Sequence, residues 1–519
     1  MTWPRLVFGV LLTTLITRSY CFTTEIKRNS LSYEEARNAV MDAEDLLSTG
    51  GNIVLSKKEE AVNRIFMKYK MAELAVGYEG GDENYAPGMH FFKGKKIIDN
   101  SKVFKFLKKM PKGALLHAHN SAQVSSEWVI KNLTYTPGLL TCVNQDGVTV
   151  LSFRKSEKHN CNSRYSTVNL KRRKSEGRKF FDRQLEKSIN LYTPVPELEY
   201  MSLNKVWTRF QNIFSTISDV LKYLPAFRTF HWRMLEELYE DGIMYLEVRM
   251  EFKKLYDEEG KEYPPEFAAM ELMSLVKRFR ALHPDFLGLK VIYSTNRKIE
   301  LRGVSNKLEA FKKFHKEDPN FVIGFDLVGQ EDLGNSLYNL IDELKALPDS
   351  AKYFFHAGET NWYGAASDYN LLDAILLNST RIGHGYALLK HPVLWNAVKK
   401  RDIALEISPI SNQVLNLVWD LRNHPAAFFI SENVPIVITN DDPGFWNAKG
   451  LSYDFYYAIM SFAPNYAGLK TLKQLVWNSI KYSVLNESER EEAYDTLERK
   501  WDMFLDRIIA DEIQNSLKE

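Results

Sequence analysis

Short apolar runs rich in β-branched residues alternate with helical segments through most of the chain after residue 112. Buried parallel strands typically appear as near-continuous apolar runs separated by helices. The pattern therefore predicts an α/β fold, a (β/α)8 TIM-type barrel over residues 106–519, with a doubly wound open sheet as the alternative. Eight such runs occur, at 114–119, 243–249, 289–294, 322–327, 353–357, 381–384, 403–407 and 435–439.

The segment ahead of the first predicted strand has a helical pattern. Ser32 with Glu35, and Ser56 with Glu59, have the spacing of a capping box, in which each side chain satisfies a free backbone donor at a helix start. The pattern therefore predicts an N-terminal helical arm over residues 22–105. Two interpretations stay open: a helical hairpin packed on the main domain, or an arm that forms a homodimer.

About 125 residues separate the first two predicted strands, which leaves room for an inserted subdomain over residues 124–185. Within it, residues 154–183 contain eleven lysines and arginines against three acidic residues. Such a cluster can bind a glycosaminoglycan or a cell-surface receptor, and a solvated loop is the alternative.

The first 21 residues predict a secretory signal peptide. Arg5 precedes a short apolar run at 6–12, and small residues precede a cut after Cys21. A membrane anchor needs about 20 apolar residues, and polar residues such as Arg18 interrupt the run too early. We therefore expect a secreted, extracellular protein with no membrane span. The net charge of only +2 gives no reason to expect a nucleic-acid partner.

Cleavage leaves two cysteines, Cys142 and Cys161, both in the predicted insert. In an oxidising compartment one disulfide is the economical interpretation, and two buried free thiols are the alternative. Three N-glycosylation sequons begin at Asn132, Asn378 and Asn486 and give secretion weak support.

Two histidines close the first predicted strand. His117 and His119 point to the same side because residues i and i+2 share a face of a strand. Imidazole nitrogens are good zinc ligands, although two nearby histidines alone are a weak signal. His356 closes the fifth strand, and Glu359 lies just beyond it.

Two further motifs follow strands. His384 ends the sixth run, and Asp441 with Asp442 follows the last. Adjacent acids repel unless a cation or hydrogen bonds compensate. A core histidine and an ordinary loop start are the plain alternatives. All four motifs nevertheless fall at the carboxyl ends of predicted strands 1, 5, 6 and 8, which is where barrel active sites lie.

Six strings together resemble the adenosine deaminase family. They are LLHAH at 115–119, GFDLVG at 324–329, HAGET at 356–360, IGHG at 382–385, SPISN at 408–412 and TNDDP at 439–443. The signal peptide, helical arm and cysteine-bearing insert resemble its extracellular branch, the adenosine deaminase-related growth factors. The resemblance covers nearly the whole mature chain.

This resemblance implies a secreted enzyme that deaminates adenosine and 2′-deoxyadenosine, adenosine giving inosine and ammonia. It implies one Zn²⁺ per chain, held by His117, His119, His356 and Asp441. The metal lowers the pKa of its bound water, and the resulting hydroxide attacks purine C6.

The resemblance also implies roles around the purine. His384 orients and deprotonates the water, and Glu359, with a raised pKa, donates to N1. Asp442 hydrogen-bonds N7, and the Gly329 amide hydrogen-bonds N3.

Two further positions are expected to contact the nucleoside outside the purine hydrogen bonds. Trp207 covers it in the manner of similar tryptophans in this branch, with a plain helix-packing role as the alternative. Asn120 departs from the family, whose members commonly have an aspartate just after the second histidine, so ribose recognition is where this chain differs.

A growth-factor-like ligand that acts through the insert, with or without catalysis, is the alternative function. A pure ligand has no need of every metal and proton-transfer residue, and this chain has them all. A flipped-base polynucleotide substrate is disfavoured, because the HxE…PCxxC pattern of cytidine-type deaminases is absent.

Overall fold

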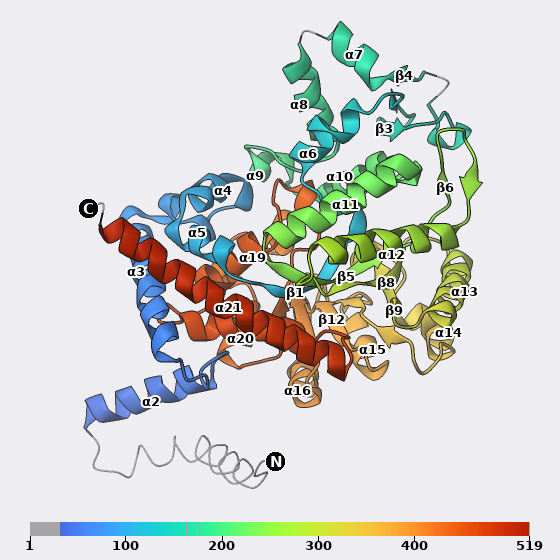
Figure 1. Cartoon of the computed structure of the whole chain (residues 1–519). Helices are drawn as coiled ribbons and strands as arrows, with labels where there is room; N and C mark the ends of the chain where they lie inside the picture. The colour runs from blue at the N-terminus through green and yellow to red at the C-terminus, as the bar shows by residue number, and fades with distance from the viewer. Residues whose placement is uncertain (1–31, 162–163, 176, 518–519) are drawn as a thin grey trace.

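The computed structural model describes residues 32–161, 164–175 and 177–517 (Figure 1). The predicted signal peptide, residues 1–21, lies outside these ranges. Through the described part of the chain, no helix is both long enough and apolar enough to cross a lipid bilayer.

Parallel strands form the centre of the molecule, at the places that the apolar runs predict. They are β1 (Gly113–His119), β5 (Ile243–Met250), β8 (Gly288–Asn296), β9 (Val322–Val328), β10 (Lys352–Tyr353), β11 (His356–Ala357), β12 (Arg381–His384), β13 (Ala404–Ile407) and β14 (Ile436–Ile438). One sheet has the order β1-β5-β8-β9-β10 and the other β11-β12-β13-β14. Only two residues separate β10 from β11, and a parallel bridge between Ala118 and Asp441 joins the end of the second sheet to β1. The predicted (β/α)8 barrel is confirmed.

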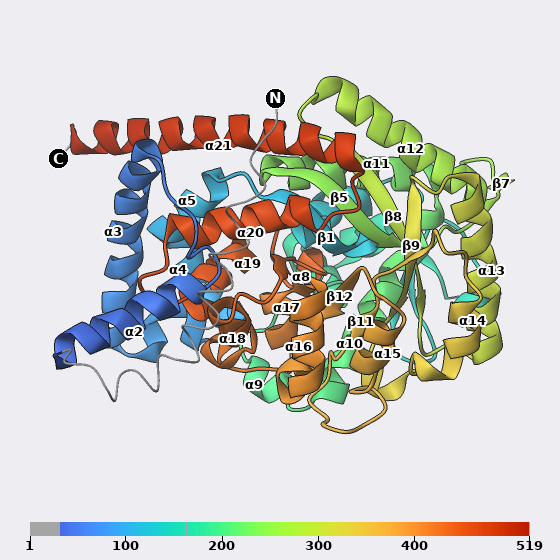
Figure 2. The ribbon, with the colours of Figure 1, turned by 90° about the horizontal axis from the view of Figure 1, so that it is seen from below.

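Helices cover the outside of these strands (Figure 2). Helix α12 (Pro265–Leu282) contacts β8, and α13 (Leu301–Glu317) contacts both β8 and β9. On the other side, α15 (Asn370–Leu376) contacts β11 and packs on α16 (Pro392–Arg401). Helix α20 (Leu469–Lys481) lies against β1 and β14, where the barrel closes. Because both faces of each strand are covered, most residues of the strands are apolar.

The N-terminal arm consists of α2 (Tyr33–Leu47), α3 (Lys57–Gly80), α4 (Phe91–Asn100) and α5 (Lys102–Lys109). Both predicted capping boxes are present, at Ser32 and at Ser56. Helix α3 packs against the long C-terminal helix α21 (Glu487–Ser516), as Figures 1 and 2 both show. Helix α2 contains no buried residue.

The insert after β1 contains α6 (Ser126–Lys131), α7 (Val168–Lys174), α8 (Arg178–Ser188) and a small antiparallel sheet of β2 (Leu140–Val143), β3 (Thr149–Ser152) and β4 (Ser166–Thr167). The sequence did not predict this sheet. Cys142 and Cys161 form the predicted disulfide, which links β2 to the loop before β4. The insert extends away from the barrel, at the top of Figure 1.

One arginine of the basic stretch points into the insert and not to solvent. Arg172 is 3% exposed, its Nε lies 2.8 Å from Asp182 Oδ1, and its guanidinium lies 3.7 Å from the centre of the Tyr135 ring. Arg173 and Lys174 beside it are exposed. The stretch is therefore only partly the solvated surface that the sequence suggested.

Candidate active site

The predicted metal-binding residues meet at the carboxyl ends of the barrel strands. His117 Nε2 lies 3.1 Å and His119 Nε2 3.0 Å from Asp441 Oδ1. One ligand atom from each of His117, His356, His384 and Asp441 falls within a group whose members all lie within 4.8 Å of one another. The strand ends thus bring residues more than 300 positions apart into one cluster.

The cluster is suited to a metal ion because it contains buried polar atoms that have no hydrogen-bond partner among the described residues. His117 Nε2 and Asp441 Oδ1 are buried and have no hydrogen-bond partner among the described residues. Buried polar atoms are almost always satisfied, and a cation is one way to satisfy such a group. Imidazole nitrogens with one carboxylate oxygen form a donor set that suits zinc.

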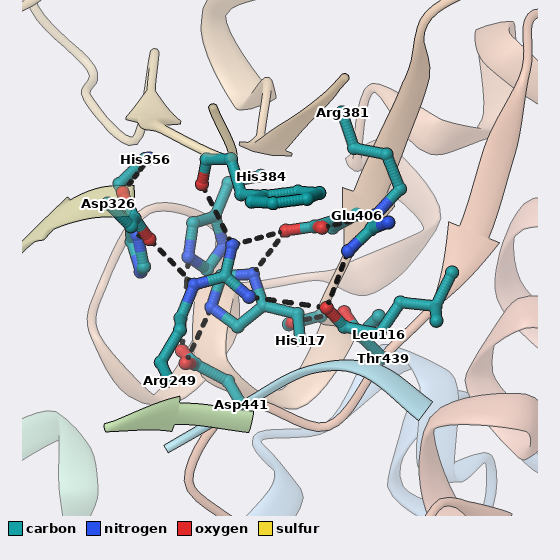
Figure 3. A network of polar contacts seen from close by, with 12 residues as sticks. Leu116, His117, Arg249, Asp326, His356, Arg381, His384, Glu406, Thr439 and Asp441 are labelled. Atoms are coloured by element: carbon teal, nitrogen blue, oxygen red, sulfur yellow. Dashed lines mark hydrogen bonds and ion pairs between the residues drawn. The ribbon is translucent and has the colours of Figure 1, made fainter. Parts of the chain in front are cut away.

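Two of the histidines are held from behind by carboxylates (Figure 3). His117 Nδ1 lies 2.8 Å from Glu406 Oε2, and His356 Nδ1 lies 2.7 Å from Asp326 Oδ2. Arg249 bridges the two acids, with Nε 2.6 Å from Asp326 Oδ2 and Nη2 2.7 Å from Glu406 Oε2. An imidazole that donates from Nδ1 has its lone pair on Nε2, so both histidines present Nε2 as a metal ligand.

A second arginine completes this network. Arg381 Nε lies 2.7 Å from Glu406 Oε1, and its Nη2 lies 2.6 Å from Glu247 Oε2. Burial alone would raise the pKa of Glu406, but the charges of Arg249 and Arg381 hold that pKa well below its usual range. Glu406 therefore stays ionised beneath His117. We call Arg249, Arg381, Glu247, Asp326 and Glu406 the charged floor; all five are buried.

The sequence motifs did not predict the charged floor. A signal was present, because Glu247 and Arg249 interrupt the second apolar run and Glu406 interrupts the seventh. A charged residue inside a buried strand is stable only when it is paired.

Two carboxyl groups at the site have raised pKa values. Burial, together with the charges of Asp441 and Glu331, raises the pKa of Glu359 well above its ordinary value. Burial and the neighbouring Asp441 raise the pKa of Asp442 in the same direction. Glu359 Oε1 and Asp442 Oδ1 have no partner among the described residues, and Glu359 Oε1 lies 3.5 Å from His384 Nε2. The raised pKa values favour the neutral form of both carboxyls, which can donate a proton or a hydrogen bond.

The backbone around Glu359 is fixed by a third acid, which the sequence analysis did not single out. Glu331 accepts hydrogen bonds from the backbone N–H of Glu359 at 2.7 Å and of Gly358 at 3.3 Å. Gly358 has φ +75°, and a Cβ there would lie 2.7 Å from the Leu371 side chain. Only glycine fits this turn, which directs Glu359 toward the cluster.

Helix α17 (Pro409–Val414) supports the other side of the cluster. Ser411 Oγ donates to Asp441 Oδ2 at 2.7 Å, and Asn412 Nδ2 lies 3.1 Å from His384 Nδ1. Gln413 Oε1 accepts from the backbone N–H of Phe91 at 2.6 Å, which ties α17 to the N-terminal arm.

The residues expected around a purine nucleoside line one cavity with the metal-binding cluster. Trp207, on α10 (Leu203–Ser218), is 4% exposed, and Gly329 has φ +95° just after β9. Asn120, Trp207, Gly329 and Asp442 all line this cavity beside His119, His356, Glu359 and Asp441.

Asn120 faces a buried histidine of the cavity wall. Its Nδ2 lies 3.5 Å from His231 Nε2, while His231 Nδ1 lies 2.8 Å from the carbonyl oxygen of Phe227. Since a carbonyl only accepts, His231 donates from Nδ1 and has a lone pair on Nε2. An amide donor suits that lone pair and a carboxylate would be repelled by it, which accounts for asparagine here.

Comparison with known proteins gives one consistent family. Residues 190–500 match the adenosine deaminase family, and residues 10–107 match the adenosine/AMP deaminase N-terminal family. Adenosine deaminase 2 of Sus scrofa is 40% identical over 486 residues, 92% of this chain and 94% of that protein, and the Homo sapiens protein is 40% identical over 485 residues with the same coverage. The Arabidopsis N6-mAMP deaminase structure aligns with a TM-score of 0.54 at 16% identity, over 76% of this chain and 99% of that one, which supports the fold.

Proposed function

The chain belongs to the adenosine deaminase family, in its adenosine deaminase 2 branch, and we propose that it is a secreted, zinc-dependent enzyme that deaminates adenosine and 2′-deoxyadenosine. The observation that carries this proposal is the buried Glu359, whose raised pKa favours the protonated form, beside a group of buried ligand atoms without partners among the described residues. A metal that supplies hydroxide and a carboxyl that donates a proton are the two groups that hydrolytic deamination requires in one cavity.

We propose His117, His119, His356 and Asp441 as the zinc ligands. His117 and His356 present Nε2 because carboxylates hold their Nδ1 atoms, and His119 Nε2 lies beside Asp441 Oδ1. When bound, zinc lowers the pKa of a coordinated water and so supplies hydroxide near neutral pH. Ser411 fixes the second oxygen of Asp441.

The acids of the cavity are suited to a purine ring. Glu359, neutral because burial raises its pKa, donates to N1 and makes C6 more electrophilic. Asp442 must also be protonated to donate to N7, and its raised pKa provides this. The backbone N–H of Gly329 donates to N3, where the absence of a side chain leaves room for the ring. Trp207 covers the nucleoside and excludes water.

The overall reaction is balanced by one water. Its oxygen forms the new bond to C6, the C6–N bond breaks, and the amino group leaves as ammonia with one proton of the water, while the other proton ends on N1 of the purine. His384 Nε2, which lies 3.5 Å from Glu359 Oε1, would orient the attacking oxygen. The product from adenosine is inosine.

The test is to follow the loss of adenosine absorbance with the full-length secreted protein, before and after removal of zinc by a chelator. We expect turnover that disappears on chelation and returns with stoichiometric Zn²⁺. No turnover by folded protein that contains one zinc per chain would refute the proposal.

Secretion, glycosylation and assembly belong to the same proposal. Asn132, Asn378 and Asn486 are all exposed, as glycosylation requires. We propose a homodimer through the arm, because α2 leaves Tyr33 and Leu47 exposed; a chain without residues 22–100 that still dimerises would contradict this.

The exposed part of the basic stretch is proposed to bind a glycosaminoglycan or a cell-surface receptor, through residues such as Arg173 and Lys174. Unchanged retention on immobilised heparin after neutralisation of residues 171–174 would contradict the glycosaminoglycan part. Nothing in the described residues favours the growth-factor-like alternative over catalysis, and we do not propose it.

A further inference from the structure

His384 is held from behind in a different way from His117 and His356. Its Nδ1 faces the side-chain amide of Asn412 at 3.1 Å, whereas theirs face the carboxylates of Glu406 and Asp326. A carboxylate only accepts, so it fixes the proton on Nδ1. A side-chain amide either donates or accepts, so its own contacts decide which nitrogen of His384 has the proton.

Those contacts form a chain that begins at a backbone amide. The N–H of Ala426 donates to His424 Nδ1 at 2.9 Å, and His424 Nε2 lies 2.9 Å from Asn412 Oδ1. A backbone amide can only donate, so His424 Nδ1 has the lone pair and His424 Nε2 has the proton. Asn412 must then turn its oxygen to His424 and its NH₂ group to His384.

Asn412 therefore donates to His384 Nδ1, and the proton of a neutral His384 is on Nε2. All three side chains, His384, Asn412 and His424, are at most 2% exposed, so water does not compete for these positions. Burial lowers the pKa of His424 to about 3, which keeps it neutral and leaves its Nδ1 free to accept.

We propose that Asn412 and His424 are positioning residues that fix His384 as the tautomer with its proton on Nε2. His384 Nε2 then has no lone pair for a metal, which separates it from His117 and His356 although all three lie in one cluster. It donates a hydrogen bond to the attacking oxygen and orients it. This differs from the proton-accepting role that family resemblance implies.

The role in catalysis rests on the proposed function, but the tautomer does not. Two-dimensional ¹H–¹⁵N NMR of the zinc-loaded full-length protein, labelled in histidine, reports which ring nitrogen is protonated. We expect a protonated Nε2 on His384 and a protonated Nδ1 on His117 and His356. A His384 with the proton on Nδ1 would overturn the proposal, whether or not adenosine is turned over.

The substitution that reverses the tautomer is Asn412→Asp, because a carboxylate accepts from Nδ1–H. A wrong tautomer in a catalytic triad lowers kcat by about 10⁴-fold, so we expect a fall of at least about 100-fold here. The KM for adenosine and the zinc content should stay within about threefold. Asn423→Asp adds the same charge at an exposed position beside His424 and should leave kcat unchanged. Unchanged kcat in Asn412→Asp would refute the proposal.

A second pair of variants decides the case if Asn412→Asp does not fold. His424→Gln keeps a donor toward Asn412 Oδ1, whereas His424→Leu removes it and frees the amide to rotate. We expect His424→Gln to retain kcat within about fivefold and His424→Leu to lose more than tenfold. Equal kcat in the two variants would refute the relay, because a purely structural role would not distinguish a donor from an apolar group in this way.

Discussion

Beneath His117 and His356 the barrel contains full charges, whereas the walls beside His384 and His231 contain neutral groups. The charged floor joins Arg249 and Arg381 to three carboxylates. In the walls, His384 instead contacts Asn412, and His231 contacts Asn120. We call these two contacts the neutral walls. Imidazoles on the floor are held ready to bind a cation, and imidazoles in the walls are held neutral to donate or accept a single hydrogen bond.

The two regions differ in what a single substitution does. A charge in the floor has no water to replace its partner, so removal of one group leaves another charge buried and unpaired. A wall contact that is lost leaves only a neutral donor or acceptor, which is a smaller loss. Stability should therefore depend mainly on the floor, and the chemistry mainly on groups that the fold leaves without partners.

Glu359→Gln tests the chemical side of this comparison and has the largest expected effect. Glutamine has the same shape but no acidic proton, so we expect kcat to fall by about 10²–10⁴-fold. Glu359 Oε1 has no partner among the described residues, so the free energy of unfolding should change by less than about 1 kcal/mol. Steady-state kinetics and urea unfolding of the zinc-loaded protein measure the two effects. A variant that retains a tenth of the activity would contradict the role of Glu359.

Arg249→Met tests whether stability depends on the charged floor. It removes the group that bridges Asp326 and Glu406 and leaves both carboxylates short of a partner, so we expect a loss of about 3–5 kcal/mol in unfolding free energy. Zinc should also be released to a chelator at lower concentration, because the carboxylates that hold His117 and His356 lose the arginine that positions them.

The matched control is Arg228→Met. Arg228 forms a similar two-bonded ion pair with Glu271, but its side chain is 48% exposed, so we expect a change of about 0–1 kcal/mol. Similar unfolding free energies for the Arg249 and Arg228 variants would show that burial does not increase the contribution of the charged floor to stability.

The neutral wall at His231 predicts that the free energy of unfolding depends on pH. Burial lowers the pKa of His231 to about 4 from the 6.5 of an unfolded chain. Between pH 6.5 and 4 the unfolded state therefore binds more protons, and stability falls as the pH falls through this window. From pH 7 to 5 this amounts to about 2 kcal/mol.

Urea unfolding at pH 7 and pH 5 measures this dependence in the wild type and in His231→Gln. The variant should lose about 2 kcal/mol less than the wild type over the same interval. His283→Gln, at a partly buried histidine outside the cavity lining, serves as the control for the loss of one imidazole. Equal slopes for the wild type and His231→Gln would disprove the neutral state of His231.

The sequence predicted which residues lie at the strand ends, but not the side chains that hydrogen-bond to them. His117, His356, His384 and Asp441 could be placed together because each follows an apolar run and barrel strands end on one face. The partner of His117 could not be found in this way, since Glu406 lies 289 residues away and reaches Nδ1 only through the register of β13. A barrel pattern predicts which face a residue occupies, whereas hydrogen-bond partners depend on side-chain directions that only the folded structure supplies.

The insert shows the same limit. Its position and its disulfide followed from the gap between strands and the count of cysteines, yet its three-stranded sheet did not. Strands β2 and β3 have only four residues each, too few for a period to be distinguished from chance. Arg172 also appeared in the sequence as part of a surface charge run. In the fold it is buried by contacts that include the ring of Tyr135 and the carboxylate of Asp182.

Asn120→Asp is the smallest change and the closest test of the neutral wall. The carboxylate would face the lone pair of His231 Nε2, and the repulsion is relieved if His231 takes up a proton. We therefore expect a higher pKa for His231 and a loss of stability from pH 7 to 5 that is smaller than in the wild type by about 1 kcal/mol. Since Asn120 lines the cavity, the ratio of kcat/KM for adenosine to that for 2′-deoxyadenosine should also change, by about two- to fivefold, or about 0.4–1 kcal/mol. Urea unfolding at the two pH values and kinetics with both nucleosides decide between two explanations of Asn120. If neither quantity changes, the asparagine neither supports His231 nor faces the ribose, and the neutral wall is restricted to His384.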